Sequence, residues 1–204
     1  MNRGAMITVR TCFFAACLPL ILLCAACGSG APAGDPPLAG ASIGGPFELV
    51  DKTGKTVRWS DFDGKYRIIY FGYSYCPDIC PLDVQRMMLG YARFKQAEPE
   101  LAAQVQPLFV TVDPARDTPA KVGEFAAAFS ADLMGLTGTD AQVDAAAKAF
   151  GVFYERGEPV NGGAYLVNHS RSAYLMGRKG EPIALLPVDI NSDAVAQELE
   201  KWVH

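Results

Sequence analysis

The sequence of 204 residues is half hydrophobic, which is enough for one domain with a substantial core. Its formal charge is −4, and a mildly acidic chain is a poor partner for nucleic acid, so we exclude that class of function. Six cysteines and only two histidines limit the side chains that could carry thiol or metal chemistry.

The first 26 residues are predicted to be a secretory signal peptide rather than part of the fold. Arg3 and Arg10 precede an uncharged apolar stretch that is short for a membrane-spanning helix and ends in small residues. Removal of the signal peptide, which contains both arginines, changes the formal charge from −4 to −6. As an alternative, residues 11–26 stay in the membrane as an uncleaved anchor helix.

The end of this stretch, CAACG at residues 24–28, resembles the lipobox of bacterial lipoproteins. In lipoproteins the cysteine is lipidated and becomes the first residue of the mature chain, so the resemblance implies lipidation at Cys27. Cys24 stands where the pattern usually has Leu. Cleavage before Cys27 would leave Cys76 and Cys80 as the only cysteines of the folded part.

Residues 27–45 are predicted to be a lipid-anchored, flexible tether, because Gly, Ala, Pro and Ser make up nearly all of them and cannot bury a core. Residues 46–204 then form a single domain. A lipobox and a tether together place this domain in the bacterial cell envelope, facing the periplasm and anchored to a membrane.

Residues 46–204 alternate short strands with helices. A β-hairpin is expected from strands at 47–50 and 55–59, which flank the turn signal Lys-Thr-Gly. Further strands are predicted at 66–73, 105–112, 133–136, 164–167, 172–176 and 183–186, and helices at 82–97, 119–129, 141–150 and from 193 onward. This order implies an α/β fold with a mixed central sheet flanked by helices, which is the thioredoxin-like layout.

The two cysteines of the domain lie where a buried strand ends and a helix begins. Pro81 suits the first position of the helix, so Cys80 is expected at the helix start, where unpaired N–H groups and the dipole lower the pKa of a nearby thiol. Cys76 is four residues earlier and within bridging reach, so oxidation is expected to form a Cys76–Cys80 disulfide. Three roles fit the pair: a structural disulfide, a redox pair, or two thiolate ligands of a metal ion.

His169 is the other candidate ligand, because it comes just after the expected strand at 164–167, whereas His204 is the last residue and is expected to be inert. Two thiolates and one imidazole are too few for a closed structural zinc site. They suit copper, since thiolates select Cu(I) and imidazole binds both oxidation states. Met87 and Met88 are potential thioether ligands, but they fall on the apolar face of the expected helix and are assigned to the core.

Asp113, Arg116 and Asp117 follow the expected strand at 105–112. A turn followed by a helix cap at Thr118 would explain this composition. Alternatively, these residues line the site, because loops after neighbouring parallel strands gather at one edge of a sheet.

Three segments together resemble the signature motifs of the Sco/SenC family: CPDICP at 76–81, TVDPARDTP at 111–119 and VNHS at 167–170. Members of that family are membrane-tethered, thioredoxin-like copper proteins that help assemble the binuclear copper centre of cytochrome c oxidase. The resemblance implies that Cys76, Cys80 and His169 bind copper, and we expect Asp113 and Asp117 to support these ligands. Asn168 replaces the Asp that many relatives have before the histidine.

Two classes of function follow. A metallochaperone would deliver copper to the copper-centre subunit of cytochrome c oxidase and exchange it with other periplasmic copper carriers. A thiol–disulfide reductase would instead keep the cysteines of that subunit reduced. Both use Cys76 and Cys80, but only copper binding requires His169, and an oxidised pair offers no thiolate to a metal. A peroxiredoxin-like peroxidase is disfavoured, because the T-x-x-C motif of that family is absent.

Overall fold

The computed structural model describes residue 1 and residues 34–160 and 164–204 of the chain. The expected signal peptide, Cys27 and the first part of the expected tether lie outside the described residues. None of the helices in the described ranges combines the length and the apolar character that crossing a bilayer requires.

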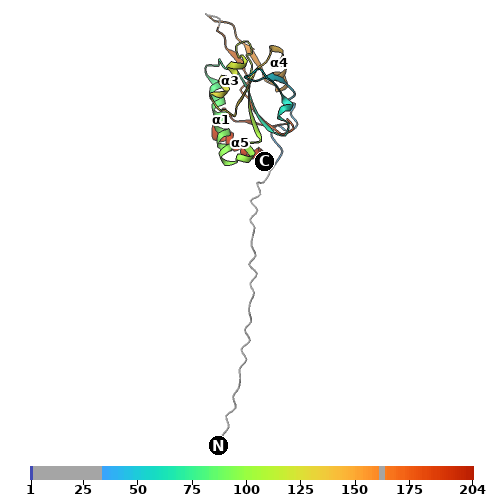
Figure 1. The fold of residues 1–204 in the computed structure, drawn as a ribbon, viewed down its shortest axis with the longest axis vertical. Coiled ribbons are helices and arrows are strands. Elements are labelled where there is room, and N and C mark those ends of the chain that lie inside the picture. Colours follow the sequence, from blue (N-terminus) through green and yellow to red (C-terminus); the bar gives the residue numbers. More distant parts are fainter. Residues whose placement is uncertain (2–33, 161–163) are drawn as a thin grey trace.

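Five strands form the central sheet, in the order β5-β4-β3-β8-β9 (Figure 1). The parallel strands are β3 (Tyr66–Gly72), β4 (Val105–Thr111) and β5 (Met134–Leu136). The strands β8 (Ala173–Met176) and β9 (Pro182–Leu186) complete the sheet in antiparallel pairing. The predicted mixed sheet of a thioredoxin-like fold is confirmed.

Helices cover both faces of this sheet, as expected. The longer ones are α1 (Ile79–Ala97), α3 (Pro119–Ala127), α4 (Asp140–Ala149) and α5 (Ser192–Trp202), and α2 (Pro99–Ala102) and the 3-10 helix η1 (Trp59–Phe62) are single turns. The helices α1 and α5 pack side by side on one face, and α4 lies on the other (Figure 1).

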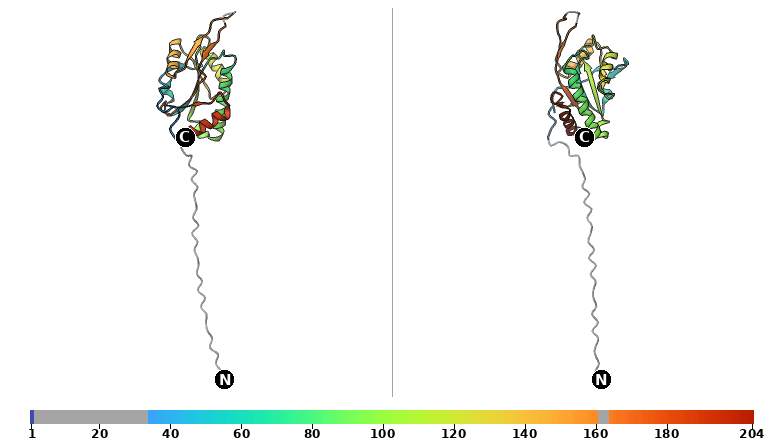
Figure 2. Two further views of the ribbon diagram at one scale, coloured as in Figure 1. Left: turned by 180° about the vertical axis from the view of Figure 1, so that it is seen from behind. Right: turned by 90° about the vertical axis from the view of Figure 1, so that its left-hand side faces the viewer.

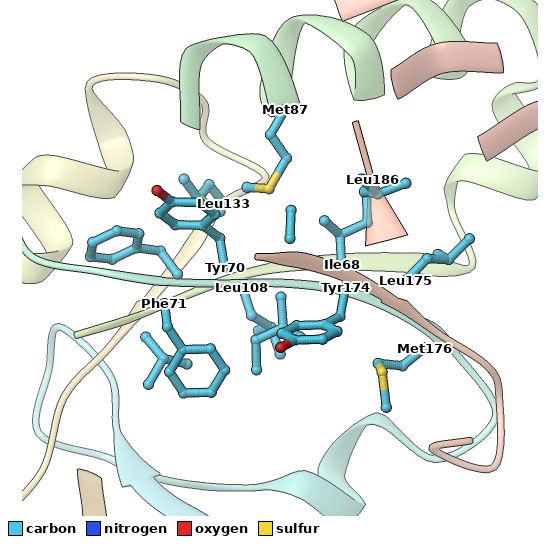
Figure 3. Packing of buried hydrophobic residues seen from close by; sticks show 14 of the residues in the cluster. Ile68, Tyr70, Phe71, Met87, Leu108, Leu133, Tyr174, Leu175, Met176 and Leu186 are labelled. Carbon is cyan, nitrogen blue, oxygen red and sulfur yellow. The ribbon is translucent and has the colours of Figure 1, made fainter. Parts of the chain in front are cut away.

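The central strand β3 is buried along its whole length, so its side chains supply both halves of the core. Ile68 and Tyr70 point toward Met87 of α1, whereas Phe71 points to the opposite face, because successive side chains of a strand alternate (Figure 3). Met87 and Met88 are both buried in the hydrophobic core, as predicted.

The N-terminal hairpin of β1 (Glu48–Val50) and β2 (Thr56–Arg58) is confirmed, but the chain is packed before it begins. Residues 34–45 were assigned to the tether, yet the N–H of Leu38 donates to the carbonyl of Ile183 on β9 (3.0 Å). Leu38 and Ile43 pack against the core, because they are the only larger apolar side chains in that Gly/Ala/Pro/Ser stretch. The packed domain therefore begins before residue 46.

A second hairpin, β6 (Tyr154–Arg156) with β7 (Val167–His169), lies outside the central sheet. It extends from the end of the domain opposite the C-terminus (orange in Figure 2). The predicted strand at 164–167 is wrong in position, since β7 begins only at Val167 and includes His169. The residues before it do not form a buried strand: Leu166 is 59% exposed, and only Tyr165 packs against the core.

The helix after the cysteines also begins earlier than predicted, at Ile79 rather than at residue 82. Pro81 is consequently the third helical residue and not the first. This position still suits proline, because the first four N–H groups of a helix have no partner within it. Cys80 therefore lies inside the first turn of α1.

Candidate metal centre

The buried carboxylate of Asp117 holds the loop that leads from β3 to the cysteines. It accepts hydrogen bonds from the backbone N–H of Ser74 (2.9 Å), from the Ser74 hydroxyl, and from the hydroxyl of Thr111 (2.6 Å). Thr111 ends β4, and Ser74 lies two residues before Cys76. Asp117 thus joins the loops that follow two adjacent parallel strands, at the edge of the sheet where such loops gather.

Cys76 and Cys80 are both free thiols, and the N–H of Cys80 lies 3.4 Å from Cys76 Sγ. Burial raises the pKa of the Cys76 thiol, but the backbone N–H groups of Asp78, Cys80 and Ile79 lower it by more, so the pKa lies below its ordinary value. Cys80 is fully buried, and burial raises the pKa of its thiol.

This asymmetry corrects one expectation from the sequence. The N–H groups at the start of α1 were expected to lower the pKa of the thiol at Cys80, but the thiol that they favour as the anion is that of Cys76. The reason is position: Cys80 is enclosed in the core within the first turn, whereas Cys76 precedes the helix, half-buried. Cys76 is therefore the more acidic and the more accessible of the two.

His169 is the last residue of β7, and its Nε2 lies 3.0 Å from the Sγ of Cys80. Its other ring nitrogen, Nδ1, lies 2.8 Å from the carbonyl oxygen of Ser170. A carbonyl can only accept, so Nδ1 carries the proton and Nε2 is free to accept one from Cys80 or to bind a metal. Burial lowers the pKa of this imidazole, which keeps the ring neutral.

The two thiols and the imidazole form one cluster. Their donor atoms, Cys76 Sγ, Cys80 Sγ and a nitrogen of His169, all lie within 4.8 Å of one another. Among the described residues this is the one group of three or more cysteine, histidine or acidic side chains close enough to hold a metal ion. Its donors are soft or borderline, which suits copper, and three of them are one short of a closed structural zinc site.

Asp113 is fully buried and holds the segment that leads to β7. It pairs with Arg116, accepts a hydrogen bond from the hydroxyl of Tyr165 (2.7 Å) and lies 3.6 Å from Arg156. The guanidinium of Arg116 also donates to the carbonyl of Tyr165 (2.9 Å) and stacks over its ring. The turn-and-cap explanation holds for Thr118, which caps α3; Asp113 and Arg116 brace the hairpin that carries His169.

Two more charged residues lie beside the cluster, and neither could be selected from the sequence. Asp83 follows Cys80 by three residues on α1 and is fully buried, and Arg171 follows His169 by two. The guanidinium of Arg171 donates twice to the carboxylate of Asp83, at 3.0 and 2.9 Å. The one signal in the sequence was that each lies close to a candidate ligand, Asp83 to Cys80 and Arg171 to His169.

The comparisons with known proteins agree with this geometry. The family model described as SCO1/SenC matches residues 36–204. The chain belongs to the SCO1/SenC family. Proteins of this family handle copper in the assembly of cytochrome c oxidase.

Individual relatives within the SCO1/SenC family extend this result. Protein SenC of Rhodobacter capsulatus is 44% identical over 144 residues, which are 69% of this chain and 62% of SenC. The structure of Arabidopsis thaliana ScoI with copper bound has a TM-score of 0.71 at 33% identity and covers 78% of this chain and 96% of that chain. Yeast Sco1 with copper bound has a TM-score of 0.70 at 36% identity and covers 77% and 86%. The chain thus spans less than two thirds of SenC's own length.

Proposed function

We propose that this chain is a membrane-tethered copper metallochaperone that delivers copper to the binuclear copper centre of cytochrome c oxidase. One observation carries the proposal: the donor atoms of Cys76, Cys80 and His169 lie within 4.8 Å of one another. The copper-bound relatives from Arabidopsis and yeast support it. The partners would be the copper-centre subunit of the oxidase and other periplasmic copper carriers.

Copper is the substrate of this activity, which the protein binds and releases. Cys76 is the thiolate that is available first, because the pKa of its thiol lies below the ordinary value. Cys80 gives up its proton when the metal binds, since only the thiolate is a ligand. His169 offers Nε2, because Nδ1 is held by the carbonyl of Ser170.

A copper titration of residues 34–204 tests the ligand set. This part of the chain folds on its own in a relative, because the Arabidopsis structure matches 78% of this chain with 96% of that one. The reduced protein should bind a single copper ion, and Cu(II) should give a thiolate charge-transfer band. The change His169→Ala should weaken binding by a factor of about 100 or more, because the loss of even an outer-shell partner of a ligand costs about 10- to 100-fold.

His204→Ala is the matched control, because it removes the other histidine, whose side chain lies at the exposed end of the chain. It should bind copper as tightly as the parent. If His169→Ala and His204→Ala bind copper equally well, His169 is not a ligand and the proposed site is wrong.

A second candidate function is thiol–disulfide reduction, which the asymmetry between the two thiols favours. The accessible thiolate of Cys76 would attack a disulfide of the target and form a mixed disulfide, which the thiol of Cys80 would then resolve. The target gains two electrons and two protons, and Cys76 and Cys80 end as a disulfide that an external dithiol must reduce again. In this reaction His169 is not required.

The two functions are separated in the cell by single replacements at limiting copper, with assembly of the oxidase copper centre as the readout. A chaperone needs all three donors, so His169→Ala should be as damaging as Cys76→Ser. A reductase needs only the cysteines, so a His169→Ala strain with normal oxidase activity would favour the reductase.

The membrane anchor is part of the proposal and has its own test. Lipidation at Cys27 would fix the chain to a membrane of the bacterial envelope, with the domain facing the periplasm. Cells fed labelled palmitate should incorporate label into the parent chain, and Cys27→Ser should abolish it. Label retained by Cys27→Ser would remove Cys27 as the site of lipidation.

A further inference from the structure

The second turn of α1 carries a buried charge whose partners come from two other parts of the chain. Asp83 is fully buried, and its carboxylate accepts hydrogen bonds from Arg171 Nε (3.0 Å), from Arg171 Nη2 (2.9 Å) and from the hydroxyl of Tyr70 on β3 (3.1 Å). All of these donors converge on one carboxylate that lies three residues after Cys80, on the same side of the helix.

Arg171 fixes the short segment that contains His169. The residue between them, Ser170, provides the carbonyl that accepts the proton of His169 Nδ1. The opposite side of this segment is held by Phe153, whose N–H donates to the Ser170 hydroxyl (3.1 Å) and whose carbonyl accepts from the Ser170 N–H (2.9 Å). Arg171 thus links this segment to α1 through a side chain other than that of His169, whose Nε2 lies against Cys80.

Tyr70 joins the same group of residues to the imidazole directly. Its ring lies edge-on to the ring of His169, with 6.3 Å between the centroids and an angle of 89° between the planes. The ring of Tyr73 also lies edge-on to the imidazole, with 5.8 Å between the centroids and 87° between the planes. Because the Tyr70 hydroxyl donates a hydrogen bond to Asp83, the ring that packs against His169 is held by the same carboxylate.

We infer that Asp83 and Arg171 are positioning residues of the metal centre: the ion pair between the buried carboxylate of Asp83 and the partly exposed guanidinium of Arg171 locks residues 169–171 onto α1 and thereby aims His169 Nε2 at Cys80. The inference rests on the proposed function, in which His169 is a ligand. A two-donor fork fixes orientation as well as distance, which a single surface charge would not do. The need for such a lock follows from the fold, because among the strands of the described ranges β7 pairs with β6 alone and not with the central sheet.

The experiment compares Arg171→Met, which keeps an unbranched apolar stem but loses the charged fork, with a matched control, Arg93→Met. Arg93 lies on α1 and also forms an ion pair with an aspartate. This partner, Asp193, is exposed and is far in sequence from the three candidate ligands. The first readout is the tautomer of His169 in the reduced, metal-free residues 34–204, taken from the nitrogen NMR shifts of the imidazole. The second readout is copper affinity.

In the parent and in Arg93→Met, His169 should be a single Nδ1–H tautomer. In Arg171→Met, the ring should show both tautomers, and copper should bind about tenfold more weakly. Arg171→Lys, which keeps the charge but has no fork, should lie between the two. In a His169→Ala background, Arg171→Met should weaken copper binding no further.

Several results would overturn the inference. One is an unchanged tautomer and unchanged copper affinity in Arg171→Met, even with lower thermal stability, since the pair would then be merely structural. Another is an equal loss of copper affinity with and without His169. If Arg171→Met does not fold, an Nε2–H tautomer in the parent or parent-like behaviour of Arg171→Lys overturns it instead. The tautomer is measured without copper. A parent protein that binds no copper would therefore refute the proposed function, and the positioning role would still be judged by the NMR result.

Discussion

Replacement of Asp117 by alanine should destabilise the domain through the cysteine loop. The carboxylate is fully buried and accepts three hydrogen bonds, two from Ser74 and one from Thr111. Each bond to a charged group contributes about 1.5 kcal/mol or more, but water can replace part of the two bonds to Ser74, which is half-buried. We expect a loss of about 3 kcal/mol in the free energy of unfolding.

Urea unfolding of the reduced, metal-free residues 34–204 measures this loss, and thermal unfolding should show a decrease of about 6–12 °C. Asp117→Asn should cost less, about 1–2 kcal/mol, because its amide oxygen can still accept from the Ser74 N–H and the Thr111 hydroxyl, while the Ser74 hydroxyl can turn to accept from the amide NH2 group. Copper affinity should fall in Asp117→Ala as well, since Ser74 lies two residues before Cys76.

The control for this prediction is Asp193→Ala, which breaks an exposed ion pair with Arg93 and should change stability by less than about 0.5 kcal/mol. A loss of the same small size in Asp117→Ala would refute the reasoning. It would mean that water satisfies the Thr111 hydroxyl and both Ser74 donors when the carboxylate is absent.

Three further predictions concern the thiols and the core. Iodoacetamide near pH 7 should modify Cys76 well before Cys80, because the pKa of the Cys76 thiol is lowered while burial raises that of Cys80; equal rates by mass spectrometry would contradict this. The modification rate at Cys76 should rise with pH and level off below the usual thiol pKa of about 8.5. Mild oxidation should form the Cys76–Cys80 disulfide and abolish copper uptake, whereas uptake by the oxidised form would show that the thiols are not ligands. Phe150→Ala should lower the free energy of unfolding by about 3–5 kcal/mol in urea, because the ring is fully buried against Trp59 and Phe71, and a loss below 1 kcal/mol would contradict it.

Much of the fold could be predicted from the sequence because its signals are local. The apolar run at 66–73 is typical of a strand buried on both faces, and the structure has β3 there. The caps were equally readable: Thr118 with Pro119 begins α3 as expected. The short hairpin strand β6 was missed and β7 was misplaced, because residues 164–166 are apolar in part but do not form a buried strand: Ala164 and Leu166 are exposed.

The candidate site was only partly predictable. Cys76 and Cys80 could be selected from their place between strand and helix, but His169 is 89 residues from Cys80 and was joined to it only by the family resemblance. Asp83 resembles any acidic residue on a helix, and Arg171 resembles any cation in a loop. Their role becomes apparent only in the folded chain, where the two side chains form an ion pair although they are 88 residues apart in the sequence.

Most of the buried polar side chains lie around the candidate site, and there is a physical reason for this distribution. Among the described residues, six polar or charged side chains are buried: Arg67, Asp83, Thr111, Asp113, Asp117 and Thr137. Four of them, all except Arg67 and Thr137, belong to the networks that hold the cysteine loop, the His169 segment and the hairpin.

Burying a carboxylate costs free energy that its hydrogen bonds offset only when every partner is in place. A domain built for stability alone would use apolar side chains there. The buried carboxylates lie where three donors from separate elements must be held within reach of one metal ion, and the loss of any one of their partners should therefore disturb the ligands before it disturbs the fold.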